Sequence, residues 1–122
     1  MTNLERPQLE PMLEPATTTL TITEVIEGTG VEAPVGGTVK VHYLGVDYET
    51  GEEFDSSWGR GEPIEFPLNR LIKGWQEGIP GMKVGGRRTL ICPPADAYGE
   101  AGGGHRLSGR TLVFVIDLLG VR

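Results

Sequence analysis

The sequence has a single cysteine and no long apolar run, and each shortage excludes a class of protein. Cys92 has no second cysteine with which to form an internal disulfide, which excludes the small disulfide-stapled folds. It lies in the run Leu90-Ile91-Cys92-Pro93, a context that favours a small buried hydrophobic residue over a reactive thiol. A chain of 122 residues is one domain by length and can bury a core without a stapling metal or disulfide.

Membrane-spanning segments and basic clusters are also missing. The longest uninterrupted apolar run, residues 112–116, is far too short to cross a bilayer. Residues 1–20 contain three prolines, three glutamates and no apolar run, so no signal peptide is predicted. The net charge of −6 disfavours binding to the phosphate backbone of nucleic acids. We therefore expect a cytoplasmic protein with neither a membrane nor a nucleic acid among its partners.

Familiar catalytic motifs are absent as well. The 19 glycines form no phosphate-binding loop. The two histidines, His42 and His105, have no cysteine near them, and metal sites need several convergent ligands. Ser56, His42 and Asp55 could be written as a catalytic triad, but nothing around Ser56 resembles a nucleophile elbow. The sequence predicts no metal, no cofactor and no hydrolase.

The pattern of apolar residues indicates mainly β-structure. Residues 18–24, 38–46, 86–92 and 110–119 alternate as strands do, and residues 49–52 form a turn after which the chain returns through residues 53–54. A single short helix is predicted at about 72–77, because Gly74, Gly78 and Pro80 prevent it from growing. Several strands with one short helix predict an α+β fold, an antiparallel sheet packed on that helix, over residues 18–122.

Residues 1–17 are predicted to be a disordered tail. Pro7, Pro11 and Pro15 stand four apart among three glutamates, which blocks a helix and supplies no core. The alternative is a proline-rich ligand for another domain.

Eight short segments resemble, in order and spacing, the FKBP-type peptidyl-prolyl cis-trans isomerases, which bind the macrolides rapamycin and tacrolimus. The resemblance covers about residues 20–119 and implies the fold of that family, a twisted half-barrel of antiparallel strands wrapped around one short helix. The segments are 41–43, 54–57, 66–68, 71–75, 81–85, 90–94, 97–99 and 111–114.

The resemblance implies an aromatic pocket for a prolyl ring, with Trp75 as its floor. Any one of these aromatic residues could be an ordinary core residue, but as a set with their flanking residues they favour the pocket. The implied walls and their extensions are Tyr43, Phe54, Phe66, Leu71 and Phe114.

It also implies polar roles at the same pocket. The backbone N–H of Ile72 and the hydroxyl of Tyr98 would donate to substrate carbonyls. Asp55 would be the polar member, paired with the Tyr43 hydroxyl and Arg60, because a carboxylate among rings must be hydrogen-bonded or paired. Alternatively, Asp55 is an ordinary turn residue.

The loop after Tyr98 departs from the family pattern. Residues 105–110 replace an isoleucine followed by two prolines, and Leu107 is the candidate for the apolar contact at the lip of the pocket. We expect this change to alter macrolide affinity and substrate preference more than turnover.

We therefore expect a monomeric peptidyl-prolyl cis-trans isomerase that acts on Xaa-Pro bonds in proline-containing peptides and unfolded proteins and so assists folding. A proline-binding module with incidental turnover is the second hypothesis. A chaperone is the third, and it is disfavoured because only 12 residues separate Tyr98 from Thr111, too few for an inserted domain.

Overall fold

The structure is a computed structural model that describes residues 19–99 and 103–122. The tail predicted over residues 1–17 lies outside the described residues. Within them, no helix is long and apolar enough to cross a membrane.

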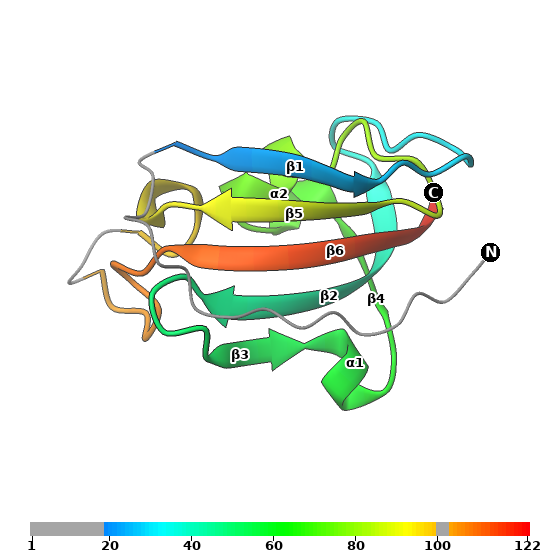
Figure 1. Ribbon diagram of the computed structural model, residues 1–122. Coiled ribbons are helices and arrows are strands. Elements are labelled where there is room, and N and C mark those ends of the chain that lie inside the picture. Colours follow the sequence, from blue (N-terminus) through cyan, green and yellow to red (C-terminus); the bar gives the residue numbers. More distant parts are fainter. Residues whose placement is uncertain (1–18, 100–102) are drawn as a thin grey trace.

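The described chain forms one antiparallel sheet in the order β1-β5-β6-β2-β3 (Figure 1). β4 pairs with residues 38–41 of β2, whereas β3 pairs with residues 44–46, so the two short strands pair with different halves of β2. The strands are β1 (Thr21–Ile26), β2 (Thr38–Asp47), β3 (Glu53–Ser56), β4 (Ile64–Pro67), β5 (Arg87–Cys92) and β6 (Leu112–Val121).

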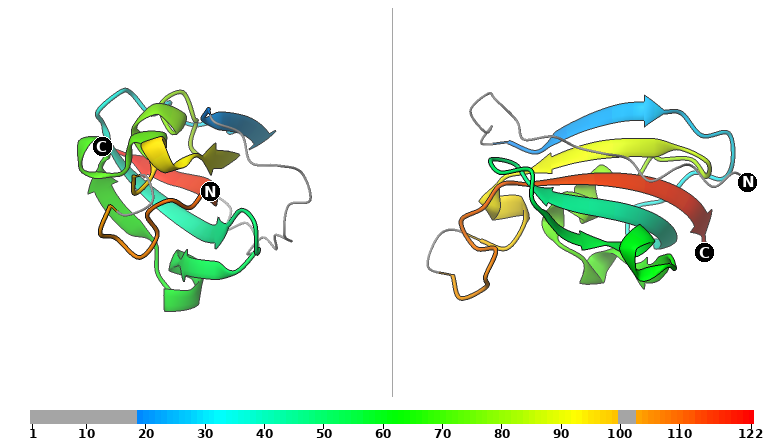
Figure 2. Two further views of the ribbon diagram at one scale, coloured as in Figure 1. Left: turned by 90° about the vertical axis from the view of Figure 1, so that its left-hand side faces the viewer. Right: turned by 60° about the horizontal axis from the view of Figure 1, so that its bottom comes forward.

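Two short α-helices and two 3-10 turns complete the fold. The sheet twists and curves around α2 (Figure 2), so α2 and the curved face enclose the main core. The helical elements are α1 (Ser57–Arg60), α2 (Lys73–Gly78), η1 (Leu68–Arg70) and η2 (Pro94–Asp96). The predicted α+β fold, a twisted half-barrel around one short helix, is confirmed, and the helix predicted at 72–77 is α2.

The strand pattern predicted neither α1 and β4 nor the two 3-10 turns. α1 has only four residues, and its start depends on the Ser56 side chain, which accepts a hydrogen bond from the Gly59 N–H at 3.1 Å. Gly61 ends it with φ 83°, a left-handed conformation that glycine adopts without steric cost. Such a short helix has no hydrophobic period for sequence analysis to detect.

The inner face of the sheet approaches α2 closely. A Cβ atom on Gly74 would lie 2.4 Å from the Cys92 sulfur, so this side of the helix has room only for glycine. Cys92 is fully buried, and burial raises the pKa of its thiol to about 12. The prediction of a buried, unreactive cysteine is therefore confirmed.

Asp47 joins the end of β2 to the start of β6. Its carboxylate accepts bonds from the Glu49 and Thr50 N–H groups at 2.9 and 3.1 Å and pairs with the Arg110 guanidinium at 2.6 and 2.8 Å. The hydrogen bond from Arg110 is the main reason that the pKa of Asp47 lies below its ordinary value of 3.8. The carboxylate thus fixes the turn after β2 and the chain that enters β6.

We expect Asp47→Asn to lower the free energy of unfolding by about 1–3 kcal/mol, the usual effect of losing hydrogen bonds to a charged group. Because the folded-state pKa of Asp47 is depressed, its contribution is present above pH 3.8 and is lost as the pH falls through the lower folded-state pKa. Denaturant titrations between pH 2 and 7 should therefore show a shallower acid loss in the variant.

Glu49→Gln is the matched control for this prediction. Glu49 lies 3.8 Å from the same guanidinium but its side chain is 69% exposed, and such pairs contribute little. If Glu49→Gln loses as much stability as Asp47→Asn, the stabilisation does not come from the Asp47 carboxylate in particular.

Candidate functional site

A cavity of about 190 Å³ opens between α2 and the inner face of the sheet. Its wall is formed by residues of β2, β3, β4, β6 and α2 and of the loops that adjoin them. Its lining is mostly aromatic and aliphatic, with one carboxylate: Tyr43, Phe54, Asp55, Ile64, Phe66, Leu71, Ile72, Trp75, Tyr98 and Phe114.

Trp75 of α2 forms the base of an aromatic cluster. The Tyr43 ring meets it at 5.1 Å and 78°, and the Phe114 ring at 5.3 Å and 90°. Phe54 packs edge-on against Phe114 at 5.6 Å and 88°. Edge-to-face pairs add to the stabilisation from burial alone, and each ring limits the rotation of its neighbours. The cluster is therefore a rigid, apolar enclosure.

Gly45 of β2 makes room for two of these rings. It points to the inner face, opposite Phe114 on β6. A Cβ atom at position 45 would lie 2.6 Å from the Phe54 ring and 3.0 Å from the Phe114 ring. The missing side chain therefore lets Phe54 and Phe114 meet across β2.

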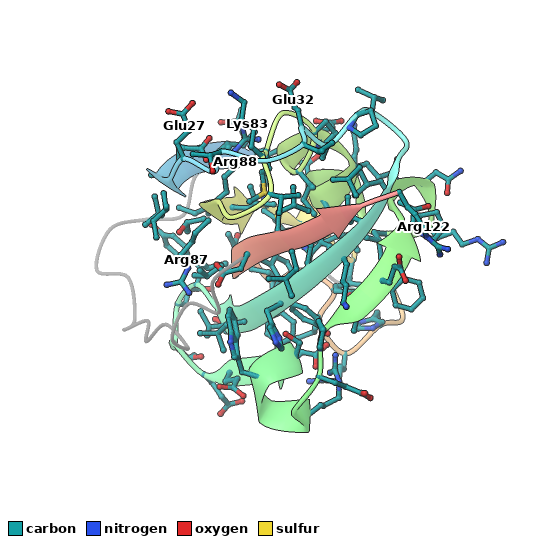
Figure 3. The ribbon with its side chains drawn as sticks, turned by 90° about the vertical axis from the view of Figure 1, so that its right-hand side faces the viewer. Glu27, Glu32, Lys83, Arg87, Arg88 and Arg122 are labelled. Atoms are coloured by element: carbon teal, nitrogen blue, oxygen red, sulfur yellow. The ribbon has the colours of Figure 1, made fainter. Side chains whose placement is uncertain are left out.

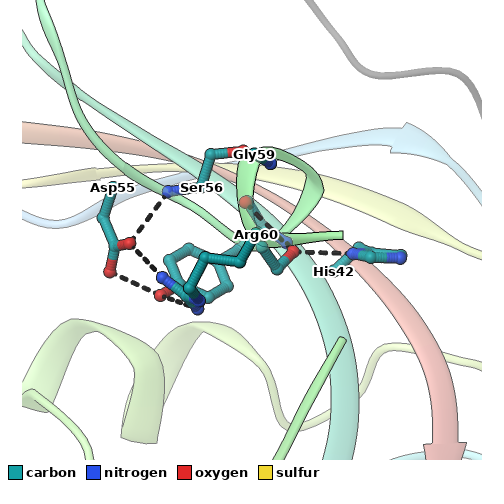
Figure 4. A network of polar contacts seen from close by, with 7 residues as sticks. His42, Asp55, Ser56, Gly59 and Arg60 are labelled. Carbon is teal, nitrogen blue, oxygen red and sulfur yellow. Dashed lines mark hydrogen bonds and ion pairs between the residues drawn. The ribbon is translucent and has the colours of Figure 1, made fainter. Parts of the chain in front are cut away.

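Asp55 is the one charged group in the lining, and three neighbours donate hydrogen bonds to its carboxylate (Figure 4). The Tyr43 hydroxyl donates to Oδ2 at 2.5 Å, and the Ser56 N–H donates to Oδ1 at 2.9 Å. Arg60 forms an ion pair with Oδ1 and also donates to the Tyr43 hydroxyl at 2.9 Å. These bonds allow a carboxylate to remain beside aromatic rings.

The two tyrosine hydroxyls of the lining remain protonated at neutral pH. Burial is the main cause that raises the pKa of Tyr43, and the hydrogen bond to Asp55 raises it further. Burial also raises the pKa of Tyr98, with a smaller contribution from the charge of Asp55. Both hydroxyls are therefore hydrogen-bond donors rather than bases, and no group of the lining is arranged as a general base.

α1 holds the polar part of the site in position. Ser57 is fully buried, and its Oγ accepts from the Tyr43 N–H at 2.7 Å. The same Oγ lies 2.7 Å from Nδ1 of His42, the neighbouring residue on β2. The last residue of α1, Arg60, reaches back to Asp55. A four-residue helix thus connects β2 to the carboxylate of the cavity.

The loop after Tyr98 fixes that residue at the mouth of the cavity. The His105 ring stacks on the Tyr98 ring at 4.0 Å and 7°, and Ser108 Oγ donates to the Tyr98 carbonyl at 2.9 Å. Within the described residues no acceptor is found for the Tyr98 hydroxyl or for the backbone N–H of Ile72. Two donors at the cavity are therefore available to a ligand.

The structure brings together nine of the residues that the sequence singled out for this site. Arg60 is not part of the lining but contacts it through Asp55 and Tyr43. The nine are Tyr43, Phe54, Asp55, Phe66, Leu71, Ile72, Trp75, Tyr98 and Phe114.

Leu107 lies apart from this group. Leu107 is only 8% exposed and belongs to the main core. It also lines a second cavity together with Phe54, Arg106 and Arg110. Its predicted contact with a ligand at the lip stays a prediction.

Sequence analysis missed Ile64 of the lining. The signal was present, because Ile64 and Phe66 stand two apart in β4 and so point to the same face. Without the strand itself being predicted, that alternation could not be used.

The described residues contain no group of three or more histidine, cysteine or acidic side chains that could hold a metal ion. What the cavity offers is apolar volume and two hydrogen-bond donors.

Comparison with known proteins agrees with this geometry. The family model of the FKBP-type peptidyl-prolyl cis-trans isomerases matches residues 30–119. A probable FK506-binding protein of Corynebacterium glutamicum is 65% identical over 116 residues, which cover 95% of this chain and 98% of that protein. An FK506-binding protein of Streptomyces anulatus is 50% identical, over 98% of this chain and 99% of that protein.

Solved structures show the same fold. The crystal structure of FkpA from Escherichia coli matches with a TM-score of 0.77 and 43% identity, over 88% of this chain and 51% of that one. AtFKBP13 matches with a TM-score of 0.74 and 38% identity, over 84% of this chain and 93% of that one. This chain therefore belongs to the family of FKBP-type peptidyl-prolyl cis-trans isomerases.

Proposed function

We propose that this protein accelerates cis-trans isomerisation of Xaa-Pro bonds by enclosing the prolyl ring above Trp75. The observation that carries this proposal is the rigid aromatic cavity, which has no free charge and no general base. A reaction that transfers no proton and forms no covalent intermediate suits such a site.

The physical reason lies in the electronic structure of the amide. Resonance keeps the bond planar, with a barrier to rotation of about 18–20 kcal/mol, and it places negative charge on oxygen and positive charge on nitrogen. Twisting the bond reduces that charge separation. A water-poor aromatic enclosure therefore disfavours the planar ground state relative to the twisted state, and only such a difference accelerates the step.

The two available donors orient the substrate. We assign the N–H of Ile72 and the hydroxyl of Tyr98 to substrate carbonyls on either side of the ring. Asp55 acts as a positioning residue, because its bonds to Tyr43 and Arg60 fix the wall opposite Trp75.

The required acceleration is modest. Uncatalysed exchange takes tens to hundreds of seconds, so about 10³ turnovers per second needs a barrier lower by about 6–7 kcal/mol. Desolvation, two hydrogen bonds and the binding of a twisted conformer together supply this reduction of the barrier.

The apolar lining of the cavity also indicates which ligands it favours. We propose that apolar residues are preferred before proline, because Phe66 is 46% exposed and offers apolar surface beside the cavity. Relatives of this chain are named for binding FK506, and we propose that FK506 and rapamycin occupy the cavity of this chain. Assistance to protein folding, a monomeric state and a cytoplasmic location stay predictions.

The first test is cis-to-trans exchange of a Leu-Pro peptide, measured with and without an excess of rapamycin. We expect acceleration that rapamycin abolishes, because both ligands need the space above Trp75. Acceleration that rapamycin leaves intact would contradict macrolide binding but retain the enzyme. No acceleration by the folded protein would contradict the isomerase mechanism and favour a proline-binding module.

We expect Gly45→Ala to lower kcat/KM about fivefold or more while the sheet stays folded. The new Cβ would displace Phe54 and Phe114, and overpacking of about 1–3 kcal/mol, if it falls on the transition state, corresponds to about 5- to 150-fold in a rate constant. The measurement is peptide exchange together with a thermal melt.

Gly120→Ala is the matched control, since it also adds a methyl group to a strand glycine. Its Cβ would meet only the Lys40 Cβ, at an ordinary 3.7 Å. If Gly45→Ala retains the activity of this control, the close fit of Phe54 and Phe114 is not needed for turnover.

A further inference from the structure

The Gln76 side chain bonds to the peptide group that carries the proposed substrate donor. Gln76 lies in α2, and its Nε2 donates to the Leu71 carbonyl at 2.7 Å. The Leu71 carbonyl and the Ile72 N–H belong to one peptide group, the link between these two residues. Leu71 and Ile72 line the cavity, whereas Gln76 is not among its lining residues. Gln76 therefore contacts the peptide group of the donor without lining the cavity itself.

The geometry of a trans peptide gives this contact a direction. No cis peptide bond occurs in the described residues, and a planar trans group directs its C=O and its N–H to opposite sides. A carbonyl that is held toward the Gln76 amide therefore directs the Ile72 N–H away from that amide. Rotation of the peptide plane would turn this N–H from the substrate, and it would also break the bond to Gln76.

No other described group holds this carbonyl. Leu71 and Ile72 have extended backbone, with ψ of 171° and 156°, so their peptide group lies outside the hydrogen bonding of η1 and α2. Within the described residues, the Leu71 carbonyl accepts a hydrogen bond only from the Gln76 side chain. The Ile72 carbonyl accepts from the Trp75 and Gln76 N–H groups at 3.0 and 3.1 Å. Gln76 thus holds the peptide groups on both sides of Ile72, one through its side chain and the other through its backbone.

Gln76 itself has a fixed position, because the far end of α2 is anchored to the sheet. Arg88 and its neighbour Arg87 project from different sides of β5 (Figure 3). Arg88 donates to the carbonyls of Gly78 and Pro80 at 3.0 Å each. The bond from Gln76 therefore ties the peptide group of the donor to a helix that is itself held by β5.

We propose that Gln76 is a positioning residue for the isomerase reaction, acting through its hydrogen bond to the Leu71 carbonyl. It holds the Ile72 N–H toward the substrate carbonyl. It also strengthens this N–H as a donor, because hydrogen bonds that form a chain polarise one another. The chain of bonds runs from the Gln76 amide through one peptide group to the substrate. This inference rests on the proposed isomerase function.

The role requires a hydrogen-bond donor at position 76. Glutamate has the shape of glutamine, but an ionised carboxylate only accepts hydrogen bonds and would bring a second acceptor to the Leu71 oxygen. Methionine has a similar length and no donor. Gln76→Glu and Gln76→Met therefore remove the bond with and without the introduction of a charge.

The test is cis-trans exchange of a Leu-Pro peptide, measured by NMR with the full chain between pH 7 and pH 4. At pH 7 we expect both variants to lower kcat/KM about fivefold, the rate equivalent of one ordinary hydrogen bond. Near pH 4 the carboxyl group introduced by Gln76→Glu gains a proton and becomes a donor. Its deficit relative to the wild type at the same pH should then shrink, whereas the deficit of Gln76→Met should stay constant. A loss of helix packing alone would give no such recovery in acid.

Glu77→Gln is the matched control, because it makes the reverse exchange at the next position of α2. The Glu77 side chain is 51% exposed and lies 3.8 Å from Lys73, and an exposed pair of this kind contributes little. We expect this variant to keep kcat/KM within about twofold of the wild type. Thermal melts of all four chains accompany the kinetics.

Wild-type kcat/KM in Gln76→Met would overturn the inference, and so would a deficit of Gln76→Glu that does not shrink in acid. A loss in Glu77→Gln equal to that of the Gln76 variants would also overturn it, since the effect would then belong to α2 as a whole. If Gln76→Glu does not fold, the result for Gln76→Met decides. A wild-type chain without any acceleration would overturn the proposed function and this inference together, a result distinct from an active wild type that is insensitive to changes at Gln76.

Discussion

The site depends on the short distance between α2 and strand β5. Gly74 and Gly78 face β5, and a Cβ atom on either would lie within 2.7 Å of Cys92 or Leu90. Glycine weakens a helix by about 1 kcal/mol relative to alanine, so a six-residue helix with two glycines is held by its packing. Arg88 adds to this by donating to the carbonyls of Gly78 and Pro80 at 3.0 Å. Trp75 is thereby fixed against the sheet, and the cavity forms around it.

The polar part of the site follows from a second constraint, the need to satisfy a carboxylate among aromatic rings. Asp55 is tolerated because Tyr43, Ser56 and Arg60 bond to it, and Arg60 is available only because α1 turns the chain back toward β2. The same bonds that stabilise the fold therefore pair the one carboxylate of the cavity with Arg60 and Tyr43.

The two faces of the sheet are linked through α1. Its Ser57 bonds to the backbone of Tyr43, its Trp58 stacks on His42, and its Arg60 reaches the cavity. Trp58 also packs against a second hydrophobic cluster, which includes Leu44, Val46 and Val113.

The sequence by itself determined the fold class and the longer strands, since strand alternation is a local signal, and its resemblance to the FKBP-type isomerases implied nearly all of the cavity lining. It did not reveal Ile64, because β4 is too short for its alternation to stand out. Tertiary structure alone decided that Gly45 admits two rings and that Leu107 lies in the core beside a second cavity. These features depend on contacts between residues far apart in the chain, and no local pattern encodes such distances.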